Sequence, residues 1–486
     1  MEKVQLDRNS IYTLVVGMGV TGLSVVRYLR SLGERVVVVD SRDLPPGMKL
    51  LKENFPDVEL YTGKFKSELF TSARRIVVRP GVPMSETALQ EAKEQGVEIT
   101  GDIDLFAHEV TAPVVGITGS NGKSTVTTLL AEMAKCAGIN AVMAGNIGTP
   151  VLDVIEGDYE LYVLELSSFQ LETLQNLPME VAVVLNISPD HMDRYNDLND
   201  YVLTKQEIYR NAKTCVVNRD DELAGNQLCV CSEDIGFTVK APMNNDFGLR
   251  EYDGVDWLCH GVKRLLSVDE VKIKGTHNLA NILAALAMGS VLNIPQKFML
   301  EAIKNFSGLE HRMQLLAEKE GVNWFNDSKA TNVGASIAGI EGLPGMHVLI
   351  AGGEAKDADF VELAKVAANH LRAAVLIGRD ANLIGQVLNG VVPVVHAVDM
   401  NEAVIKAAEL AQVGDNVLLS PACASFDMYR NFEHRGQVFV DAVREYVQLG
   451  CGWLCRQLNL NLSALARGSW IIWILCWCLF AWHCCR

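Results

Sequence analysis

The sequence predicts an α/β protein of three domains, each built around a largely parallel β-sheet. Short runs rich in Val and Ile alternate with amphipathic stretches of helical period, which is typical of repeated strand-helix units. This alternation restarts twice along the chain. The length of 486 residues also exceeds what one ordinary hydrophobic core supports, and a prior of about 150 residues per domain suggests about three domains.

The strand-like runs define the expected domains. In the first domain, residues 1–101, strands are predicted at 11–16, 35–40 and 76–78. In the second, residues 102–305, they are predicted at 113–118, 161–165 and 181–186. The third, residues 306–450, has strand-like runs at 348–350, 374–377 and 416–419.

Residues 451–486 differ in kind from the rest of the chain. They hold five of the seven tryptophans, and the run from Trp470 to Trp482 contains no charged residue. This run is shorter than the roughly 20 apolar residues that a membrane-spanning helix needs. Tryptophans favour the membrane-water boundary, so an interfacial anchor stays open. We interpret the segment as an extension outside the fold in preference to an anchor.

Charge and cysteine usage narrow the class of protein. A formal net charge of -16 argues against a nucleic-acid groove or an anionic membrane surface as the partner. The cysteines before residue 451 form no paired Cys-x-x-Cys motifs, which argues against structural zinc and favours reduced thiols. A charged start, residues 1–10, leads directly into a strand pattern without a signal-peptide core. We therefore expect a cytoplasmic protein whose phosphate contacts are local pockets.

The strongest chemical motif is the glycine loop, Gly116-Ile-Thr-Gly-Ser-Asn-Gly-Lys-Ser124. It is close to G-x-x-x-x-G-K-[ST], with one extra residue between the outer glycines, and it follows a predicted strand and precedes a predicted helix. Backbone N-H groups of such a loop close around phosphate oxygens, Lys123 adds a positive charge, and Ser124 or Thr125 offers a hydroxyl to Mg2+. An ordinary glycine-rich turn is the competing interpretation.

A second motif, the first glycine turn, is Gly17-Met-Gly-Val-Thr-Gly22. It follows the first predicted strand, and Asp40 ends the second strand 18 residues later, so the spacing fits a dinucleotide-binding, Rossmann-like fingerprint. Such a turn places a diphosphate on a helix N-terminus, and UDP carries a diphosphate and a ribose as NAD does. The fingerprint does not name its ligand, and a turn used only for packing stays open.

Three further residues come after strands of the second domain. Glu165 ends an apolar strand at the sheet edge where open α/β sheets bind ligands, which suits a metal ion. His191 follows the next buried strand, and Lys205 comes 14 residues later in a helical stretch. A lone His or Lys is more often structural, so spacing alone leaves these two as candidates.

Several motifs together resemble the Mur ligase family in order and spacing, over about residues 10 to 450. The motifs at 420–427 and 431–436 resemble its D-glutamate-adding branch. These motifs are the glycine loop through Thr125, Leu-Glu-Leu-Ser-Ser-Phe-Gln at 164–170, Asp-His-Met-Asp-Arg at 190–194, Gly275-Thr-His-Asn-Leu-Ala-Asn281, His311-Arg312, Asn326-Asp-Ser-Lys-Ala-Thr-Asn332, Ser420-Pro-Ala-Cys-Ala-Ser-Phe-Asp427 and Asn431-Phe-Glu-His-Arg-Gly436.

The resemblance implies an ADP-forming, ATP-dependent ligase of bacterial peptidoglycan precursor synthesis, and hence of cell-wall biogenesis, cell shape and cell division. Its substrates would be UDP-N-acetylmuramoyl-L-alanine and D-glutamate, joined through an acyl phosphate. The first domain would be Rossmann-like and bind the UDP group, the central domain would be a P-loop ATPase-like parallel-sheet domain, and the third a Rossmann-like α/β domain for the amino acid. We expect ATP and two Mg2+ sites, a monomer, no nucleic acid, and no membrane for the core.

The resemblance also assigns roles to individual residues. Catalysis would rest on Lys123, Glu165, His191 and Lys205, and the metal ligands would be Ser124, Glu165, His191 and a carbamylated Lys205. The UDP-substrate would be held by Val20, Thr21, Asp40, Arg42, Gly81, Asn146 and Ser167. ATP would be held by Gly119, Asn121, Gly122, Lys123, Ser124, Thr125, Asn278, Asn281, Arg312 and Asp327, and D-glutamate by Lys329, Thr331, Lys356, Ser425 and Phe432.

One departure and three alternatives stand beside this interpretation. The family usually has Ser-Pro-Gly where this chain has Arg79-Pro80-Gly81, and an arginine can still meet an anionic phosphate. A sister ligase, or a folylpolyglutamate-synthase-like ligase, would use the same ATP chemistry with another amino acid or acceptor. An oxidoreductase built on the first glycine turn leaves the glycine loop, Glu165 and His191 without a role. A membrane-attached binding protein would instead use the tryptophan-rich segment.

Overall fold

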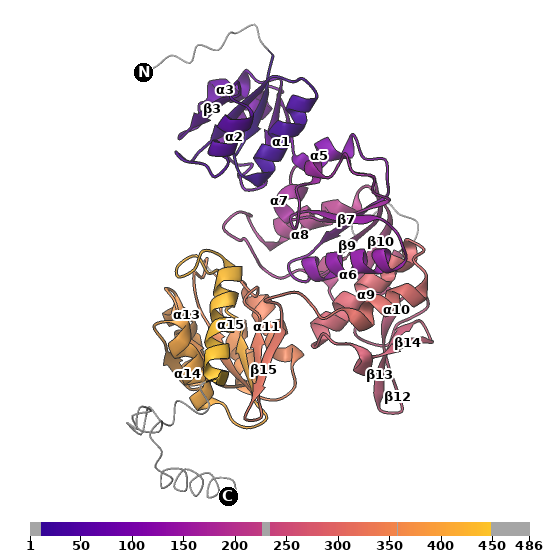
Figure 1. Ribbon diagram of the computed structural model, residues 1–486, viewed down its shortest axis with the longest axis vertical. Helices are drawn as coiled ribbons and strands as arrows, with labels where there is room; N and C mark the ends of the chain where they lie inside the picture. The colour runs from indigo at the N-terminus through magenta and orange to yellow at the C-terminus, as the bar shows by residue number, and fades with distance from the viewer. Residues whose placement is uncertain (1–10, 226–233, 357, 449–486) are drawn as a thin grey trace, which may run out of the picture. The chain divides into compact units, whose positions relative to one another are not determined.

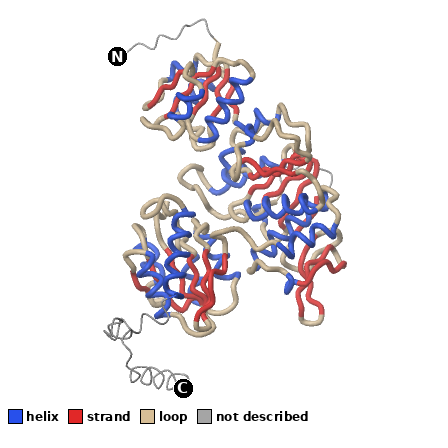
Figure 2. The backbone as a smooth tube through the Cα atoms, viewed as in Figure 1, coloured by secondary structure: helices blue, strands red, loops and turns tan. Residues whose placement is uncertain are grey.

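The computed structural model describes residues 11–225, 234–356 and 358–448, and the segment 451–486 lies outside the described residues. Figures 1 and 2 show these residues as helices and strands, with the strands of each part lying among helices. Residues through Leu309 form one unit, together with Glu341–Leu343, Lys356 and Ala358, and the other described residues form a second. Within the described ranges the strands assemble into three sheets.

The first sheet is parallel throughout, in the order β3-β2-β1-β4-β5. Its central strands are runs of Val and Ile that are buried along almost their whole length, because helices cover both faces of such a sheet. The elements are β1 (Thr13–Val16), α1 (Val20–Ser31), β2 (Val36–Asp40), α2 (Met48–Asn54), β3 (Glu59–Thr62), α3 (Ser67–Thr71), β4 (Arg75–Val78), α4 (Thr87–Glu94) and β5 (Glu98–Thr100).

The second sheet has the order β14-β13-β12-β11-β10-β9-β6-β8-β7. Its parallel part contains α5 (Asp102–Ala107), β6 (Val114–Thr118), α6 (Lys123–Cys136), β7 (Ala141–Gly145), β8 (Leu161–Glu165), α7 (Ser168–Leu171), β9 (Met179–Val184), α8 (Leu198–Gln206), β10 (Ala212–Asn218) and β11 (Asp234–Phe237). The remaining elements are β12 (Phe247–Tyr252), β13 (Val255–His260), β14 (Lys263–Ser267), α9 (Thr276–Val291) and α10 (Gln296–Asn305).

Part of the second sheet differs from the parallel sheet that the sequence predicts. Strands β12, β13 and β14 form an antiparallel meander at one edge. Most of their residues are half-exposed or exposed and only a few are buried, as an antiparallel edge that meets water allows. The run expected at 181–186 is also shifted, because β9 begins at Met179 and ends at Val184.

The third sheet has the order β15-β16-β20-β17-β18-β19, and β15 alone among these strands is antiparallel to its neighbour. The elements are β15 (Gln314–Lys319), β16 (Val322–Asn326), α11 (Val333–Gly342), β17 (His347–Ala351), α12 (Val361–His370), β18 (Leu371–Leu376), α13 (Ala381–Leu388), β19 (Val394–His396), α14 (Met400–Leu410), β20 (Asn416–Leu419) and α15 (Phe432–Gln448). The predicted three-domain α/β fold with parallel-dominated sheets is confirmed.

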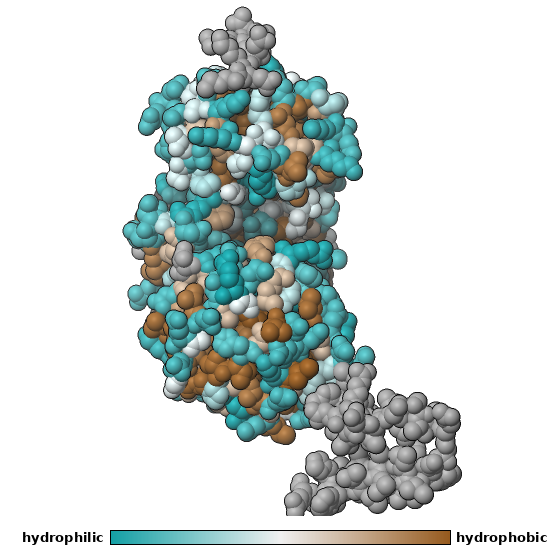
Figure 3. Space-filling model, turned by 90° about the vertical axis from the view of Figure 1, so that its left-hand side faces the viewer, coloured by the Kyte–Doolittle hydropathy of each residue, from teal (hydrophilic) through white to brown (hydrophobic). Residues whose placement is uncertain are grey.

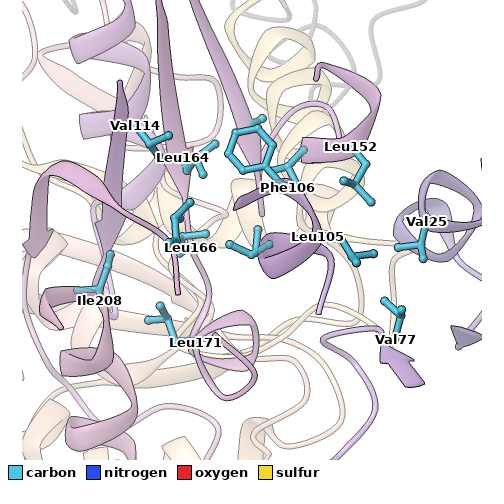
Figure 4. Packing of buried hydrophobic residues seen from close by; sticks show 14 of the residues in the cluster. Val25, Val77, Leu105, Phe106, Val114, Leu152, Leu164, Leu166, Leu171 and Ile208 are labelled. Atoms are coloured by element: carbon cyan, nitrogen blue, oxygen red, sulfur yellow. The ribbon is translucent and has the colours of Figure 1, made fainter. Parts of the chain in front are cut away.

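Apolar packing holds the second sheet to its helices. On one face, α6, α9 and α10 pack together, and α9 is apolar on nearly every side because it is buried among them. On the other face, Phe106 of α5 is fully buried and meets the ring of Tyr162 edge-on at 5.1 Å. Figure 4 shows Phe106 and Leu105 among Leu152, Leu164 and Leu166. These contacts fix the strand ends that carry the site.

Two further findings concern the surface and the cysteines. Hydrophilic residues cover most of the face seen in Figure 3, with apolar ones scattered between them. No helix within the described ranges is both long and apolar enough to cross a membrane.

Cys136, Cys259 and Cys423 are free thiols, whereas Cys215 is disulfide-bonded, so the expectation of reduced thiols is wrong at that position.

Candidate functional site

Three neighbouring parallel strands bring the predicted groups of the second sheet to one edge. Strand β6 lies between β8 and β9, and its last residues, Gly116 to Thr118, lead into the glycine loop. Glu165 is the last residue of β8, and the segment that carries His191 follows β9. Because the carboxyl ends of parallel strands share an edge, the loop, Glu165 and the segment after β9 lie side by side.

The glycine loop has a backbone that only glycine adopts readily at two positions. Gly119 has a φ of 150° and Gly122 a φ of 84°. A Cβ at Gly122 would lie 2.3 Å from Oδ1 of Asn281, so that amide packs directly against the loop. Asn278, another residue expected to bind ATP, lies one helical turn before Asn281 on α9 and donates from Nδ2 to the Lys274 carbonyl over 2.7 Å.

Two lysine side chains meet at one carbonyl of this loop. Nζ of Lys123 donates to the Gly119 oxygen at 2.8 Å and to the Ser120 oxygen at 3.0 Å, and Nζ of Lys205 donates to the same Gly119 oxygen at 3.0 Å. Lys205 is 2% exposed and has no ion pair with a described residue. Burial, reinforced by the charge of Lys123, lowers the pKa of Lys205 well below its ordinary value.

Glu165 carries the clearest indication of a missing cation. Its Oε1 accepts a hydrogen bond from Nδ2 of Asn146 at 2.7 Å, while its Oε2 is buried and has no hydrogen-bond partner among the described residues. A buried carboxylate oxygen is costly unless a donor or a cation meets it. The hydroxyl-bearing Ser124, 4% exposed, lies in the first turn of α6 at the same edge. A carboxylate and a hydroxyl are oxygen ligands of the kind that Mg2+ prefers, so this pair fits the ion.

His191 has a left-handed backbone, with a φ of 58°, and its ring lies 4.7 Å from that of Phe169. Burial lowers the pKa of His191, which favours the neutral imidazole able to accept a metal ion or a proton. Within the described ranges, no group of three His, Cys, Asp or Glu residues is arranged for a metal.

Sequence reasoning did not single out the residues that hold the glycine loop in shape. Oδ1 of Asn186 accepts from the Asn121 N-H at 2.8 Å, and Nδ2 of Asn186 donates to the Asn121 carbonyl at 3.0 Å. Oγ of Ser120 donates to the Ser188 carbonyl and lies 3.1 Å from the Tyr201 hydroxyl. The usable signal was the stretch Asn186-Ile-Ser188 directly after a buried strand, where side chains reach the neighbouring loop.

The first glycine turn and Asp40 meet in the structure. Asp40 ends β2, is 2% exposed, and accepts hydrogen bonds from the Met18 N-H and from the backbone and guanidinium of Arg42. Burial pushes the pKa of Asp40 up, but the bonds from Arg42 and Met18 outweigh it and lower this pKa to about 2. Thr21 lies in the first turn of α1 beside Val20, which is 75% exposed. Gly81 is exposed after β4.

In the second unit, three adjacent strands place the residues expected to bind D-glutamate. Strands β16, β20 and β17 are neighbours, and Lys329 and Thr331 follow β16 while Ser425 follows β20. Nζ of Lys329 lies 3.9 Å from the ring centroid of Phe432. Ser425 is 2% exposed, and its carbonyl accepts from the Tyr429 N-H at 2.8 Å.

A buried arginine that the sequence reasoning missed links these segments. Arg435 of α15 is 1% exposed. It donates from Nε to Oγ of Ser328 at 3.0 Å, from Nη2 to the Ser328 carbonyl at 2.8 Å, and from Nη1 to the Cys423 carbonyl at 3.0 Å. Arg435 belongs to the motif at 431–436, three residues after Phe432, and that position is the sequence signal that could have identified it.

The remaining predicted residues occupy other places in the fold. Thr125 is buried in the first turn of α6, and Ser167 caps α7 in a capping box with Gln170. Asp327, which follows β16, accepts from Oγ of Ser420 at 2.9 Å, and Arg312 lies just before β15. Lys356 groups with the first unit and has a φ of 49°. The residues expected to bind ATP come from both units, and so do those expected to bind D-glutamate. That each set forms one binding site stays a prediction.

Comparison with known proteins adds to this geometry. Family models match three stretches: the MurD-like N-terminal domain of Mur ligases at residues 12–101, the Mur ligase middle domain at 117–289, and the Mur ligase glutamate ligase domain at 311–423. A UDP-N-acetylmuramoylalanine--D-glutamate ligase of Pseudomonas aeruginosa is 51% identical over 89% of this chain and 98% of its own length. One of Nitrosococcus oceani is also 51% identical, over 89% of this chain and 96% of its own.

Solved structures show the same architecture. MurC from Thermotoga maritima superposes with a TM-score of 0.56 at 18% identity, covering 90% of this chain and all of that one. MurF from the same organism, in complex with ADP, gives a TM-score of 0.56 at 17% identity, over 91% of this chain and 97% of its own. At these identities the likeness shows the fold alone, which is that of a class of three-domain α/β ligases.

The chain belongs to the Mur ligase family. Within that family, the relatives at about half identity are named as D-glutamate ligases. Membership in a ligase family leaves no support for the oxidoreductase built on the first glycine turn.

The pH dependence of stability tests the burial of Asp327. Burial raises the pKa of this carboxyl from 3.8 to about 7, so between these values the folded chain retains a proton that the unfolded chain has lost. The associated stability is fully present below pH 3.8 and is lost as the pH rises through about 7. Asp327→Asn should remove this loss. The thermal midpoint of the wild type should therefore fall relative to the variant across this window, and parallel curves would contradict the assignment.

Proposed function

We propose that the chain joins D-glutamate to UDP-N-acetylmuramoyl-L-alanine with hydrolysis of ATP to ADP and phosphate. The observation that carries this proposal is the identity of about one half, over nearly the whole length, with ligases named for that reaction. The setting is peptidoglycan precursor synthesis in the bacterial cytoplasm, and the working form is a monomer with domains at residues 1–101, 102–305 and 306–450. The residue roles below are part of the proposal.

ATP is needed because a carboxylate does not acylate an amine near neutral pH until one oxygen becomes a leaving group. The terminal phosphoryl group of ATP passes to the carboxylate of the L-alanyl substrate and forms an acyl phosphate. The amine of D-glutamate then attacks the acyl carbon and phosphate leaves. Phosphoryl transfer gathers negative charge between donor and acceptor, and catalysis consists mainly of positioning and neutralising that charge.

The glycine loop supplies both of these functions. Its backbone N-H groups, at the N-terminus of α6, cradle phosphate oxygens. The hydrogen bonds that hold Nζ of Lys123 on the Gly119 and Ser120 carbonyls keep its charge at the mouth of the loop. Asn278, Asn281, Arg312 and Asp327 complete the ATP site, with Gly119, Asn121, Gly122 and Thr125 from the loop itself.

Two magnesium sites are part of the proposal. Ser124 and Glu165 would hold one ion, and the buried Oε2 of Glu165, which has no hydrogen-bond partner in the described part of the chain, supports this placement. His191 and a carbamylated Lys205 hold the other. Bound Mg2+ would neutralise phosphate charge and polarise the reacting oxygens. Asn146 hydrogen-bonds Glu165 and so orients the carboxylate.

The surroundings of Lys205 support its carbamylation. A neutral amine adds to the carbon of CO2 and releases a proton, which gives a carbamate anion with two oxygens. Burial favours the neutral amine because it lowers the pKa of Lys205. The carbamate converts a cation crowded against Lys123 into an oxygen ligand for a hard metal ion.

The amino acid is held by the second unit and by Lys356. D-glutamate carries two carboxylates, and Lys329, Lys356, Thr331 and Ser425 are cations and hydroxyl donors of the right type. The ammonium of Lys329 lies over the ring of Phe432, which helps to hold it in place. Arg435 fixes the segments around Ser328 and Cys423, and thereby the position of Lys329 and Ser425.

Carbamylation is directly measurable. After incubation of the purified chain with carbon-13-labelled bicarbonate near neutral pH, one lysine carbamate resonance should appear in the carbon NMR spectrum, distinct from that of the N-terminal amine, whose ordinary pKa of about 8 also allows reaction. Exposed lysines stay protonated at that pH and do not react. The Lys205→Arg variant should lack the resonance, since a guanidinium does not form a carbamate under these conditions. A wild-type spectrum without a carbamate, or a resonance that survives in the variant, would remove the modification from the proposal.

An amino-acid panel tests the reaction itself. Phosphate release from ATP should require both UDP-N-acetylmuramoyl-L-alanine and an amino acid, and D-glutamate should exceed L-glutamate and L-lysine by roughly 100-fold in kcat/KM, because a polar site rejects ligands that leave its groups unpaired. Equal rates with L-lysine would favour a sister ligase. Release of phosphate without the UDP-substrate would remove the proposed acceptor.

A further inference from the structure

Arg79 lies where the first sheet changes its direction of growth. The chain passes from β1 to β2 on one side and later returns to β4 on the other, so β1 and β4 are neighbours at a topological switch point. Open α/β sheets bind ligands in the crevice at the carboxyl ends of such strands. The first glycine turn follows β1, Arg79 follows β4, and the Arg79 N-H donates to the Val16 carbonyl at 3.0 Å.

Three glycines make room for the Arg79 side chain. A Cβ added at Gly17 would lie 3.1 Å from its Cβ and Cδ, one added at Gly19 would lie 3.3 Å from Nη1, and one added at Gly81 would lie 2.9 Å from Nη2. The side chain therefore lies along the first glycine turn, with its guanidinium beside Gly19, the N-cap of α1. Pro80 restricts the Arg79 backbone to extended conformations, which helps to fix this direction.

No described residue offers the Arg79 guanidinium a negative charge that is still free to pair with it. Arg79 is half-buried, and its side chain has no hydrogen bond or ion pair with any described residue. Asp40 is the nearby acid, but its two oxygens already accept four hydrogen bonds, from the Met18 N-H and from Arg42. Gly19 provides no side-chain cap, so the positive end of the α1 dipole also faces this place.

The direction in which the pKa of Arg79 is shifted agrees with this excess of positive charge. Burial lowers the pKa of Arg79, and the neighbouring charge of Arg42 acts in the same direction. A guanidinium near a second guanidinium and a helix N-terminus is stabilised by an anion placed between them. A nucleoside diphosphate carries such an anion at the position where the glycine turn leaves its backbone accessible.

We propose that Arg79 binds the diphosphate of the UDP-substrate and so sets the affinity of the first domain for a nucleoside diphosphate. This inference rests on the proposed function for the identity of the ligand. A guanidinium gives a planar, charged, two-pronged contact, where a hydroxyl at this position would give one neutral hydrogen bond. Affinity for the nucleotide should consequently depend on ionic strength more strongly than hydroxyl contacts alone would require.

Calorimetric titration of the full chain with UDP, uridine and inorganic pyrophosphate tests this role. Arg79→Gln should weaken binding of UDP and pyrophosphate by roughly 10- to 100-fold, as expected for loss of charge-assisted hydrogen bonds, and should leave uridine binding unchanged. It should also flatten the salt dependence of UDP binding. Arg79→Lys, which keeps the charge without the fork, should lie between the two. Arg74→Gln is the matched control, because Arg74 is an exposed arginine at the opposite end of β4.

Several outcomes would overturn the inference. UDP binding by Arg79→Gln equal to that of the wild type would remove the contact, and tighter binding would show that Arg79 obstructs the crevice. An equal loss in Arg74→Gln would reduce the effect to net charge. If D-glutamate ligation proceeds with an unchanged KM for the UDP-substrate in Arg79→Gln, the inference fails while the proposed function stands. If Arg79→Gln loses UDP affinity but the wild type ligates nothing, the inference stands while the proposed function fails. A wild type without affinity for UDP or pyrophosphate overturns both the inference and the proposed function.

Discussion

Two lysine side chains that share one backbone carbonyl set the character of the central site. Lys123 and Lys205 both donate to the oxygen of Gly119, and Oε2 of Glu165 is buried with no hydrogen-bond partner among the described residues. Neither arrangement is favourable in isolation, because like charges repel and an unpaired buried oxygen loses its hydration. In the proposal, conversion of Lys205 to a carbamate removes the repulsion from Lys123, and a cation meets the Glu165 oxygen.

The fold explains why these groups meet. Parallel strands β8, β6 and β9 end at one edge, and the same arrangement recurs where β1 and β4 carry Gly17 and Arg79, and where β16 and β20 carry Lys329 and Ser425. Each sheet thus offers one ligand edge. Hydrogen-bonded side chains keep these edges in shape, such as the half-buried Asn186 amide on the glycine loop and the buried Arg435 guanidinium between Ser328 and Cys423.

The sequence predicted those strands and loops whose residues follow a periodic or motif pattern. The runs at Leu161–Glu165 and Asn416–Leu419 were predicted with the bounds that the structure has, because continuous apolar runs identify buried parallel strands. The meander of β12 to β14 was missed, since its half-exposed residues make weaker runs. Asn186 and Arg435 were missed because bracing a backbone carbonyl has no periodic signature. The saturation of Asp40 by Arg42 likewise depends on side-chain geometry that spacing does not encode.

The most direct measurement is a calorimetric titration of ATP, with and without magnesium, against the wild type, Lys123→Ala, Glu165→Gln and Lys135→Ala. The account predicts that magnesium strengthens ATP binding to the wild type, that Lys123→Ala weakens it by roughly 100-fold, and that Glu165→Gln reduces the magnesium effect. Lys135→Ala, an exposed lysine on the same helix, should behave as the wild type. Absence of magnesium-dependent ATP binding to the wild type, or full binding to Lys123→Ala, would contradict the account.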